Sequence, residues 1–315
     1  MKTLMDFSKN MTIASTVPGD SPVAARIDLY LAERFTYFSR TRWQHEIKLG
    51  KLLCNGVAVT SPHKPVAPGD IISYEGTGMA EPPVSRAYSI AYDDGLLTVV
   101  NKPSNLPVHP SGCFFKNTLL SFLEADMNKK FYPINRIDRE TSGLVLFSQR
   151  GQSVPLLQKA LAEGEKTYFV FVHGRPAEDQ FTVSAPIGAA RNSLIRKKRE
   201  AYGDAAESAL TRFTKIRECG ELTLLKAVIE TGRTHQIRAH CLYVGLPVAG
   251  DKMYGLDERC YLEFIENGMS EKITSVLGFH RSALHCGSIE LTHPVSGKKL
   301  LLSAPLPNDL AGLLG

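Results

Sequence analysis

The sequence predicts an α+β protein in which a small α/β domain precedes a larger domain with a mixed, largely antiparallel sheet. In the larger region, residues 88–315, strand-like runs often follow one another without an intervening helix, which favours a mixed sheet over a doubly wound parallel one. The smaller region, residues 21–75, combines two helical patterns with a hairpin signal. Between them, residues 76–87 are rich in glycine and proline, which is typical of a linker.

The composition is that of an ordinary globular protein, with 43% hydrophobic and 22% charged residues in a chain of 315. No apolar run reaches membrane-spanning length, and the N-terminus lacks the basic start and apolar centre of a secretory signal. The six cysteines are scattered without a CxxC pair, so they indicate reduced thiols. We therefore expect a cytoplasmic protein without membrane contact, whose polar residues 1–20 form a flexible tail.

Two helices open the small domain. In the first, apolar residues recur at helical spacing and define one apolar face: Val23, Ile27, Leu31 and Phe35. Ser39 can cap a second helix, SRTRWQHEIKLG, which ends at Gly50. The pair Asn55-Gly56 then joins two short apolar runs and is the preferred pair for a type I′ hairpin turn. The following PGDIISY supplies a further turn and strand.

Basic residues accumulate around this predicted hairpin: Arg26, Arg34, Arg40, Arg42, Lys48 and Lys51. The pattern SRTRW…IKLGKLLCNG…PGDII resembles the small RNA-binding domain shared by a small-subunit ribosomal protein and many RNA-modifying enzymes. The resemblance implies that this domain binds RNA, with Arg40 and Arg42 among the contact residues. The alternative is a generic α/β cap whose basic side chains are solvated.

The larger domain interleaves strands with three helices. Its strand-like runs lie at residues 96–103, 143–149, 166–174, 210–216 and 222–230. Its helical patterns lie at residues 119–125, 154–164 and 235–245. A basic run at residues 191–199 (RNSLIRKKR) carries five positive charges and no negative one. This run is either a solvated loop or a loop that contacts phosphates.

One segment of the larger domain, NRIDRETSGLVLF at residues 135–147, places Asp138 between two arginines and before a Thr-Ser-Gly turn. Flanking arginines favour an ionised carboxylate at neutral pH. Such a group can act as a nucleophile, as a base or as half of a structural salt bridge, and the segment alone leaves these alternatives open. The Thr-Ser-Gly residues are expected to shape the turn that presents Asp138.

Four further segments stand out: VVNKPSNLPVHPSG (99–112), KTYFVFVHG (166–174), TGRTHQIRAH (231–240) and HRSALHC (280–286). Together with the Asp138 segment, they resemble the RluA family of pseudouridine synthases in the RLDxxTSGL signature and in the order of the VNKP, GRTHQIR and RSALHC motifs. The sequence departs from the family at Asn135, where histidine is usual, and at Ile137, where leucine is usual. These departures argue against borrowing a target site from a better-known subgroup.

The resemblance implies an enzyme that isomerises uridine in RNA to pseudouridine by breaking the N-glycosidic bond and rejoining the rotated uracil through carbon. The exchange needs neither a cofactor nor a metal, in agreement with a sequence that offers no glycine-rich phosphate loop and no zinc-type His/Cys spacing. By the resemblance, Asp138 is the essential carboxylate, Arg238 is its ion-pair partner and Tyr168 lies against the target base. A covalent adduct of Asp138 and a glycal route both stay open.

Five further residues are predicted to bind the substrate: Arg136, Arg233, His235, Arg281 and Leu284. Arg136 lies two residues before Asp138, so in an extended segment both side chains share a face. It could fill the gap left by a flipped nucleotide or bind phosphates, and a structural salt bridge is the alternative. Arg281 and Leu284 are expected to form and orient the wall of the pocket.

We therefore predict a monomeric, two-domain RNA pseudouridine synthase that acts on ribosomal RNA, with transfer RNA as the alternative substrate. An inactive RNA-binding protein of the same fold is a second alternative, although Asp138, Tyr168 and Arg238 are all present. A glycoside hydrolase using Asp138 and Glu140 is disfavoured, because alternate residues of a strand place both carboxyls on one face, about 7 Å apart along the backbone. A retaining hydrolase needs its carboxyls on opposite sides of the bond.

Overall fold

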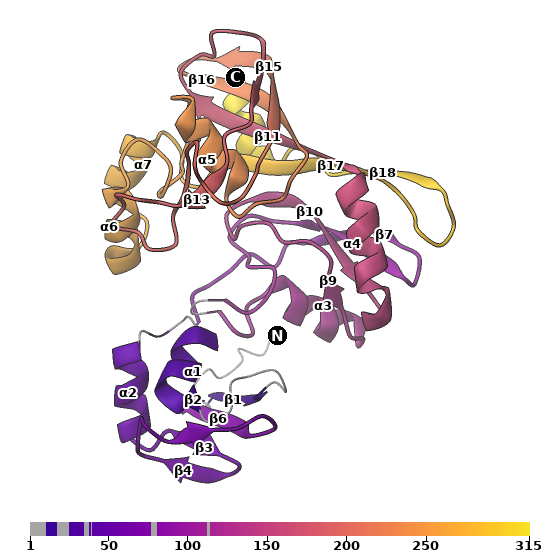
Figure 1. The fold of residues 1–315 in the computed structure, drawn as a ribbon. Coiled ribbons are helices and arrows are strands. Elements are labelled where there is room, and N and C mark those ends of the chain that lie inside the picture. Colours follow the sequence, from indigo (N-terminus) through magenta and orange to yellow (C-terminus); the bar gives the residue numbers. More distant parts are fainter. Residues whose placement is uncertain (1–10, 18–24, 35–37, 39, 77–80, 112–113) are drawn as a thin grey trace, which may run out of the picture. The chain divides into compact units, whose positions relative to one another are not determined.

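The computed structural model describes residues 11–17, 25–34, 38, 40–76, 81–111 and 114–315. The chain divides into two compact units (Figure 1). The first comprises Met1–Pro83 and His109–Thr118, and the second comprises Val84–Val108 and Leu119–Gly315. The segment His109–Thr118, which the sequence alone assigns to the larger domain, therefore belongs to the first unit.

Hydrogen bonds to Glu81 tie this segment to the described end of the predicted linker. The Glu81 carboxylate accepts the backbone N–H groups of Lys116 and Asn117, each at 2.7 Å. The side-chain amide of Asn117 donates to the carbonyl oxygen of Pro82 at 3.1 Å. Residues 81 and 82 are thus held in place by a segment 35 to 36 positions later in the chain.

The first unit packs two helices, α1 (Ile27–Arg34) and α2 (Arg40–Lys48), on a four-stranded antiparallel sheet. The strand order is β1 (Met11–Thr16), β6 (Ile71–Gly76), β3 (Leu52–Cys54) and β4 (Val57–Val59). Two further short strands, β2 (Ala25–Arg26) and β5 (Pro65–Val66), pair with each other in a separate antiparallel sheet. Trp43 is fully buried in the shared core, where its ring meets those of Phe38 and Tyr74 edge-on at centroid distances of 5.0 and 5.3 Å.

Both helices predicted for this unit are present. Ile27 and Leu31 are buried, as their helical spacing predicts. The other two apolar positions of that pattern and the proposed cap lie outside the described residues: Val23, Phe35 and Ser39. The second helix ends at Lys48, and Gly50 follows with a φ angle of 71°, which is the left-handed conformation that commonly terminates helices.

The predicted hairpin is confirmed, whereas the predicted tail is partly wrong. Asn55 and Gly56 have φ angles of 53° and 78°, as a type I′ turn between β3 and β4 requires. Within the tail expected at residues 1–20, residues 11–16 form strand β1 along β6. An edge strand leaves backbone N–H and C=O groups without a ladder partner, and an extended segment can satisfy them whatever its side-chain pattern.

Two fully buried carboxylates hold basic residues of the first unit in place. Asp28 accepts a hydrogen bond from Arg40 at 2.9 Å. Glu46 is ion-paired with Arg42 at 2.7 Å and with Lys51 at 3.0 Å. Arg40 and Arg42, the two predicted RNA contacts, therefore each engage a buried acid, while 47% and 54% of their side chains stay exposed. The unit displays oriented arginines rather than freely solvated ones.

Acid should weaken the first unit through Asp28. Burial raises the pKa of this carboxyl, but hydrogen bonds from Gln44 and two arginines outweigh burial and lower the pKa from 3.8 to about 2. Because the folded pKa lies below the unfolded value, the ionised form contributes stability that is present above pH 3.8 and is lost as the pH falls through about 2. We expect Asp28→Asn to lower the free energy of unfolding of this unit above pH 3.8. The difference in that free energy between wild type and variant should shrink by about 2 kcal/mol as the pH falls to about 2.

Fluorescence of Trp43 measures this effect. Trp43 is the single tryptophan of the chain and lies in the core of the first unit, so its emission during denaturant unfolding reports on this unit. The matched control is Glu33→Gln, which changes an exposed carboxyl of the same helix. A wild-type-minus-Asp28→Asn difference that stays constant with pH would contradict the role of Asp28.

The second unit is built on a ten-stranded sheet (Figure 1). Eight strands follow in the order β12 (Gln180–Val183), β15 (Thr211–Cys219), β16 (Leu222–Ile229), β11 (Glu165–His173), β17 (Leu284–Thr292), β10 (Ser142–Ser148), β8 (Leu97–Lys102) and β7 (Ser89–Asp93). Two more strands pair off this path: β18 (Lys299–Ser303) with β17, and β9 (Tyr132–Pro133) with β10. The predicted mixed, largely antiparallel sheet is confirmed, since β10 and β17 pair in parallel and their neighbours pair antiparallel.

The parallel ladder between β10 and β17 joins the two halves of this sheet. Two residue pairs are in register there, Ser142 with His285 and Gly143 with Cys286. Gly143 has a φ angle of 109°, and a Cβ at this position would lie 2.1 Å from the carbonyl oxygen of Cys286. Only glycine therefore allows the strands to approach so closely. The Thr-Ser-Gly sequence shapes this junction, as predicted.

Helices cover parts of the sheet, and three of them match predicted ranges: α3 (Leu119–Met127), α4 (Val154–Glu163) and α5 (Gln236–Tyr243). The sequence patterns did not indicate the others: η1 (Gly151–Ser153), α6 (Arg259–Asn267), α7 (Glu271–Leu277), α8 (Asn308–Ala311) and η2 (Gly312–Leu314). Helices α6 and α7 lie side by side around a small core of Cys260, Ile273 and Leu277 (Figure 1). Across the described ranges, no helix has both the length and the apolar character needed to cross a membrane.

The basic run at residues 191–199 occupies a separate hairpin between β13 (Ile187–Ala189) and β14 (Arg199–Ala201). Three of its five cations are ion-paired: Arg191 with Asp204, Lys198 with Glu258 and Arg199 with Glu207. A fourth, Lys197, lies over the ring of Tyr261 at 4.9 Å. These contacts hold the loop to its surroundings, so the run differs from a simply solvated loop.

Candidate active site

The turn that carries Asp138 is held by backbone contacts and by a buried lysine. The Thr141 N–H donates to the Asp138 carbonyl oxygen at 3.2 Å, which closes the turn before β10. Lys102, at the end of β8, is 1% exposed, and its ammonium donates to three carbonyl oxygens, including that of Arg139 at 3.2 Å. Because Arg139 follows Asp138 directly, Lys102 fixes the backbone next to the candidate carboxylate.

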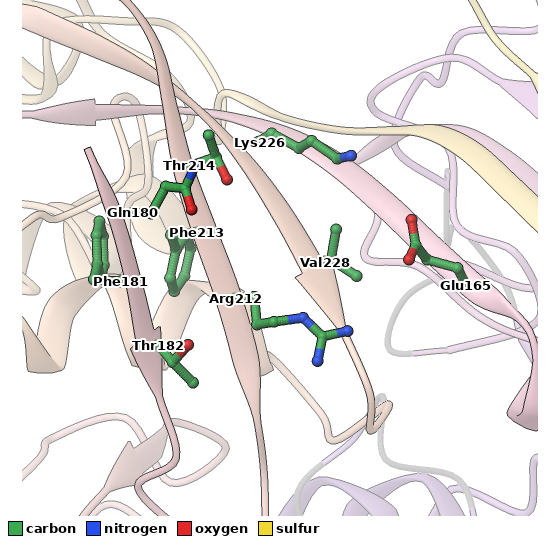
Figure 2. Close-up of a pocket in the computed structure, with 9 residues that line it drawn as sticks. All are labelled: Glu165, Gln180, Phe181, Thr182, Arg212, Phe213, Thr214, Lys226 and Val228. Carbon is green, nitrogen blue, oxygen red and sulfur yellow. The ribbon is translucent and has the colours of Figure 1, made fainter. Parts of the chain in front are cut away.

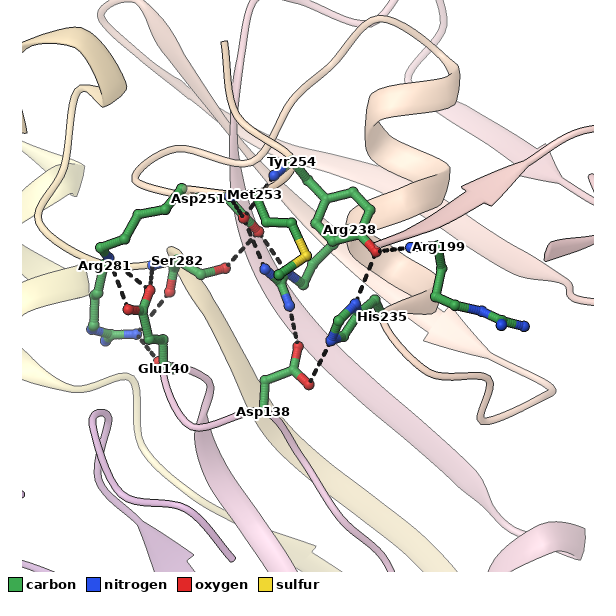
Figure 3. A network of polar contacts seen from close by, with 11 residues as sticks. Asp138, Glu140, Arg199, His235, Arg238, Asp251, Met253, Tyr254, Arg281 and Ser282 are labelled. Carbon is green, nitrogen blue, oxygen red and sulfur yellow. Dashed lines mark hydrogen bonds and ion pairs between the residues drawn. The ribbon is translucent and has the colours of Figure 1, made fainter. Parts of the chain in front are cut away.

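Gln236 fixes the turn that leads into α5. Its side-chain oxygen accepts hydrogen bonds from the Thr231 hydroxyl at 2.7 Å and from the Arg233 N–H at 3.0 Å. His235, immediately before the helix, has a φ angle of 59° in the left-handed region. The GRTHQIR segment thus forms a hydrogen-bonded turn and the start of α5, from which His235 and Arg238 point toward Asp138 (Figure 3).

Arg238 lies between two carboxylates (Figure 3). Its Nη1 donates to Asp138 Oδ2 at 2.7 Å. Its Nε and Nη2 donate to the two oxygens of Asp251 at 2.5 and 2.8 Å. Asp251 is fully buried and also accepts the backbone N–H groups of Met253 and Tyr254 at 3.0 and 2.9 Å. Asp251 therefore orients the guanidinium so that one nitrogen is presented to Asp138.

The Asp138 carboxyl is ionised at neutral pH, and 33% of its side chain is exposed. Burial raises its pKa, but the charge of Arg238, the neighbouring His235 and the Arg238 hydrogen bond lower it below 3.8. Arg238 lies 100 positions away in the sequence. The ion pair with Arg238 that the resemblance implies is therefore present, and this arginine, rather than those beside Asp138, is the main group that lowers the pKa.

The two oxygens of Asp138 have different surroundings. Oδ2 is bonded to Arg238, whereas Oδ1 faces His235 Nε2 at 3.7 Å. On the other side of the imidazole, Nδ1 lies 2.8 Å from the hydroxyl of Tyr254. The ring of Tyr254 also contacts the Arg238 guanidinium, whose Cζ lies 4.7 Å from the ring centroid. Oδ2 is therefore fixed by a hydrogen bond, whereas the distance from Oδ1 to His235 is too long for one.

Asp138 lines a pocket of about 90 Å³. Seven of the ten site residues predicted from the sequence line this pocket: Arg136, Asp138, Tyr168, Arg233, His235, Arg238 and Leu284. Isoleucines supply much of the apolar wall: Ile137, Ile229 and Ile237. The pocket thus unites the turn before β10 with β11, the start of β17 and the start of α5.

Tyr168, on β11, contributes a neutral phenol to the pocket. The side chain is 7% exposed, and burial raises the pKa of the hydroxyl well above 10, as do the neighbouring Cys286 and Asp138. The pocket therefore combines a carboxylate anion with a protonated hydroxyl at neutral pH. This pairing of a base or nucleophile with a neutral proton donor suits acid–base or covalent chemistry.

Three residues predicted to bind the substrate lie outside this pocket. Arg281 is 4% exposed, is ion-paired with Asp309 at 2.6 and 2.9 Å, and donates to the carbonyl oxygen of Glu140 at 3.2 Å. This corrects the expectation that Arg281 forms the pocket wall, because its buried ion pair instead supports the turn that carries the candidate carboxylate. Arg40 and Arg42 belong to the first unit, where they engage buried acids.

Glu140 is engaged in a structural role. Its oxygens accept hydrogen bonds from Lys252 at 2.8 and 2.9 Å, and one of them accepts the Ser282 N–H at 3.1 Å. The residue does not appear among those that line the pocket. The glycoside hydrolase alternative needs a second carboxylate on the far side of the scissile bond, so this geometry argues against it.

A larger groove, of about 340 Å³, lies on β11, β12, β15 and β16 (Figure 2). Its lining consists of Glu165, Gln180, Phe181, Thr182, Arg212, Phe213, Thr214, Lys226 and Val228. Arg212 is ion-paired with Glu230, and the rings of Phe181 and Phe213 stack at 5.0 Å. Size alone favours this groove, but the smaller pocket holds the carboxylate with a lowered pKa and its oriented arginine. We therefore place the candidate active site in the smaller pocket.

Sequence reasoning missed three residues of the site: Asp251, Lys252 and Tyr254. All three lie in one turn, AGDKMYG at residues 249–255. A Gly-Asp pair in a turn usually indicates a solvated loop, so no local pattern set this one apart. Among the residues that the structure describes, no group of three or more His, Cys, Asp or Glu side chains is placed to hold a metal ion.

Comparison with known proteins relates this chain to one enzyme family. A sequence model described as RNA pseudouridylate synthase matches residues 97–243. The chain is 33% identical over 304 residues to "Uncharacterized RNA pseudouridine synthase YlyB" of Bacillus subtilis (strain 168), covering 92% of this chain and 93% of that protein. It is 31% identical over 302 residues to "Ribosomal large subunit pseudouridine synthase D" of Vibrio cholerae serotype O1, covering 92% of this chain and 90% of that protein.

A solved structure supports the fold. The structure named "Human RNA Pseudouridylate Synthase Domain Containing 4" matches with a TM-score of 0.56 and 21% sequence identity, covering 72% of this chain and 91% of that chain. A second, "Human RNA Pseudouridylate Synthase Domain Containing 1", matches with a TM-score of 0.55 and 23% identity, covering 72% of this chain and 86% of that chain. At these identities the likeness shows a shared architecture alone.

Proposed function

Because the chain belongs to the RluA family of RNA pseudouridine synthases, we propose that it converts uridines of large-subunit ribosomal RNA to pseudouridine with Asp138 as the essential carboxylate. The observation that carries this assignment of the site is the ionised Asp138 itself, which lines the pocket and has one oxygen held by Arg238. The choice of RNA draws on a relative named as a large-subunit ribosomal enzyme, which is similar over 92% of this chain.

Oδ1 of Asp138 is the oxygen that we propose to react, because Oδ2 is bonded to Arg238 at 2.7 Å. As a nucleophile, Oδ1 bonds covalently to the sugar or the base, and as a base it takes a proton from the sugar on the glycal route. In both routes the N1–sugar bond breaks, the uracil rotates, a C5–sugar bond forms and the C5 proton is released. A proton returns to N1, so the product is an isomer of the substrate and no electrons are exchanged.

Several groups of the pocket suit the binding of a flipped uridine. Tyr168 and Leu284 provide an aromatic and an apolar surface for the base. Arg136 and Arg233 lie in the same lining, where cationic side chains can contact phosphates next to the flipped nucleotide. A uridine must leave the RNA stack to reach this pocket, as is general for enzymes that act on a base within a helix.

We propose that the first unit adds a second RNA contact. Arg40 and Arg42 are oriented by buried carboxylates, yet about half of each side chain is exposed to a partner. The hairpin at residues 191–199 is a further candidate, since its anchored cations form a preorganised basic loop. A cytoplasmic monomer fits this function, because each part of the proposed chemistry is supplied by one chain.

Loss of the protein should remove specific pseudouridines from large-subunit ribosomal RNA. Carbodiimide-blocked primer extension on RNA from wild-type and deletion cells measures this. We expect one or a few stops to disappear in the deletion strain, to return with the wild-type protein and to stay absent with Asp138→Asn.

Two other outcomes separate the alternatives. Stops that disappear from transfer RNA instead would support the pseudouridine synthase activity but contradict the choice of ribosomal RNA as its substrate. Identical stops in both strains, in both classes of RNA, would support an inactive RNA-binding protein of the same fold.

A further inference from the structure

The hydroxyl of Tyr254 connects the basic hairpin with the imidazole beside Asp138. It accepts the backbone N–H of Arg199 at 2.7 Å, at the start of β14. It also lies 2.8 Å from His235 Nδ1. The tyrosine side chain is fully buried, and its backbone N–H is held by Asp251. The hydroxyl is therefore fixed in position with two polar neighbours (Figure 3).

The hydrogen atoms of this pair can be assigned by counting donors and acceptors. The Arg199 amide can only donate, so it occupies a lone pair of the Tyr254 oxygen. The hydroxyl proton is then directed to the other close neighbour, His235 Nδ1. A neutral imidazole carries one N–H, so Nδ1 is the acceptor and the proton of the ring resides on Nε2.

The opposite side of the ring leads to the same assignment. His235 Nε2 lies 3.7 Å from Oδ1 of the ionised Asp138. An unprotonated Nε2 would direct a lone pair at this anionic oxygen, whereas an Nε2–H directs a partial positive charge at it. Burial lowers the pKa of His235 to about 4, and the charge of Arg238 acts in the same direction, so the ring is neutral at physiological pH.

We propose that Tyr254 is a positioning residue, which fixes His235 as the Nε2–H tautomer and thereby directs a neutral N–H donor at Asp138 Oδ1. The inference deepens the proposed function and rests on it for the kinetic part of the test. Arg238 then serves as the charged partner of Oδ2, and His235 as the neutral partner of Oδ1. A neutral N–H group can orient the reacting oxygen without forming an ion pair with it. The carboxylate then keeps its nucleophilicity or basicity.

The backbone supports this role of His235. The residue holds a φ angle of 59°, which is uncommon for residues other than glycine and directs the side chain from the turn before α5. The neighbouring Gln236 secures the same turn through Thr231 and Arg233. The ring therefore has its position set by the backbone and its tautomer set by Tyr254.

The test compares wild-type protein with Tyr254→Phe, which removes the hydroxyl and keeps the ring over Arg238. The tautomer is read at neutral pH from the long-range proton–nitrogen spectrum of full-length protein labelled with ¹⁵N-histidine, and His235→Asn identifies the signals. We expect Nε2–H in the wild type and a shift toward Nδ1–H in Tyr254→Phe. The rate of tritium release from a large-subunit ribosomal RNA transcript labelled at uracil C5 should show kcat lowered about tenfold, with KM little changed.

Tyr92→Phe is the matched control, because it removes a hydroxyl that donates to Asp94 at 2.8 Å on another part of the second unit. This variant should keep the tautomer, kcat and KM of the wild type. An Nδ1–H tautomer or an imidazolium in the wild type would overturn the inference, as would a Tyr254→Phe variant with unchanged tautomer and kcat. Absence of tritium release from the wild type would overturn the proposed function instead, and the spectrum would still decide the tautomer.

Discussion

Asp138→Asn should abolish tritium release from RNA labelled at uracil C5 while leaving RNA binding largely intact. Asparagine keeps the size of the side chain and one carbonyl oxygen for Arg238, but it has neither a negative charge nor a nucleophilic oxygen. The charge of Arg238 stays compensated by Asp251, so the fold should tolerate the change. We expect kcat to fall by at least about three orders of magnitude, as for other essential nucleophiles or bases.

Binding and turnover are measured on the same transcript, by filter binding and by tritium release. Asp126→Asn is the matched control, because it makes the same chemical change at a side chain that is 50% exposed and outside the pocket. If Asp138→Asn turned over RNA at nearly the rate of this control, Asp138 would not be the essential carboxylate. Loss of RNA binding together with loss of turnover would instead indicate a structural role for the carboxylate.

Asp251→Ala should be the most destabilising of the substitutions considered for the second unit. The change removes the fully buried partner that binds Arg238 through two oxygens, and it also leaves the N–H groups of Met253 and Tyr254 without their acceptor. Removing one member of a buried ion pair costs about 3–5 kcal/mol. Arg238 keeps Asp138 as a partner, but two buried N–H groups lose their acceptor as well. The expected loss in free energy of unfolding is of this size and is measured by guanidinium denaturation followed by circular dichroism.

Asp257→Ala provides the comparison. Asp257 also pairs with an arginine through both oxygens, but Arg259 is 81% exposed, so the expected cost is much smaller than for Asp251. Similar losses for the two variants would show that burial of Asp251 does not determine its contribution. Asp251→Ala should also lower kcat. Without the two hydrogen bonds from Asp251, the Arg238 guanidinium is no longer held in the orientation that presents Nη1 to Asp138.

Local features of the fold could be predicted where short-range physics decides them. Asn55-Gly56 specifies its turn because both residues accept positive φ angles, and the structure has them at 53° and 78°. Helix α4 follows its apolar period between Val154 and Glu163. Gly143 appears in the predicted turn, although the close approach to Cys286 that requires a glycine is visible only in three dimensions.

The contacts that define the site could not be predicted in this way. The pair of Arg238 with Asp138 spans 100 positions and is predicted from the family resemblance, not from any periodicity, whereas the pair of Arg238 with Asp251 is not predicted. Burial of an aspartate depends on the partner that compensates it, so Asp251 resembles any turn residue until Arg238 is placed beside it. Arg281 shows the opposite error, since a motif arginine expected in the pocket is buried against Asp309.

The two-pair ladder between β10 and β17 also governs when this enzyme can become active. Asp138 precedes β10, whereas Tyr168 and Arg238 belong to elements on the side of β17. During synthesis the chain emerges from its N-terminal end, and Ser142 of β10 precedes its ladder partner His285 of β17 by 143 positions, so β17 appears long after β10. The pocket can therefore close only after β17 has emerged, and a chain interrupted before that point carries Asp138, Tyr168 and Arg238 without the ladder that joins their two parts of the sheet.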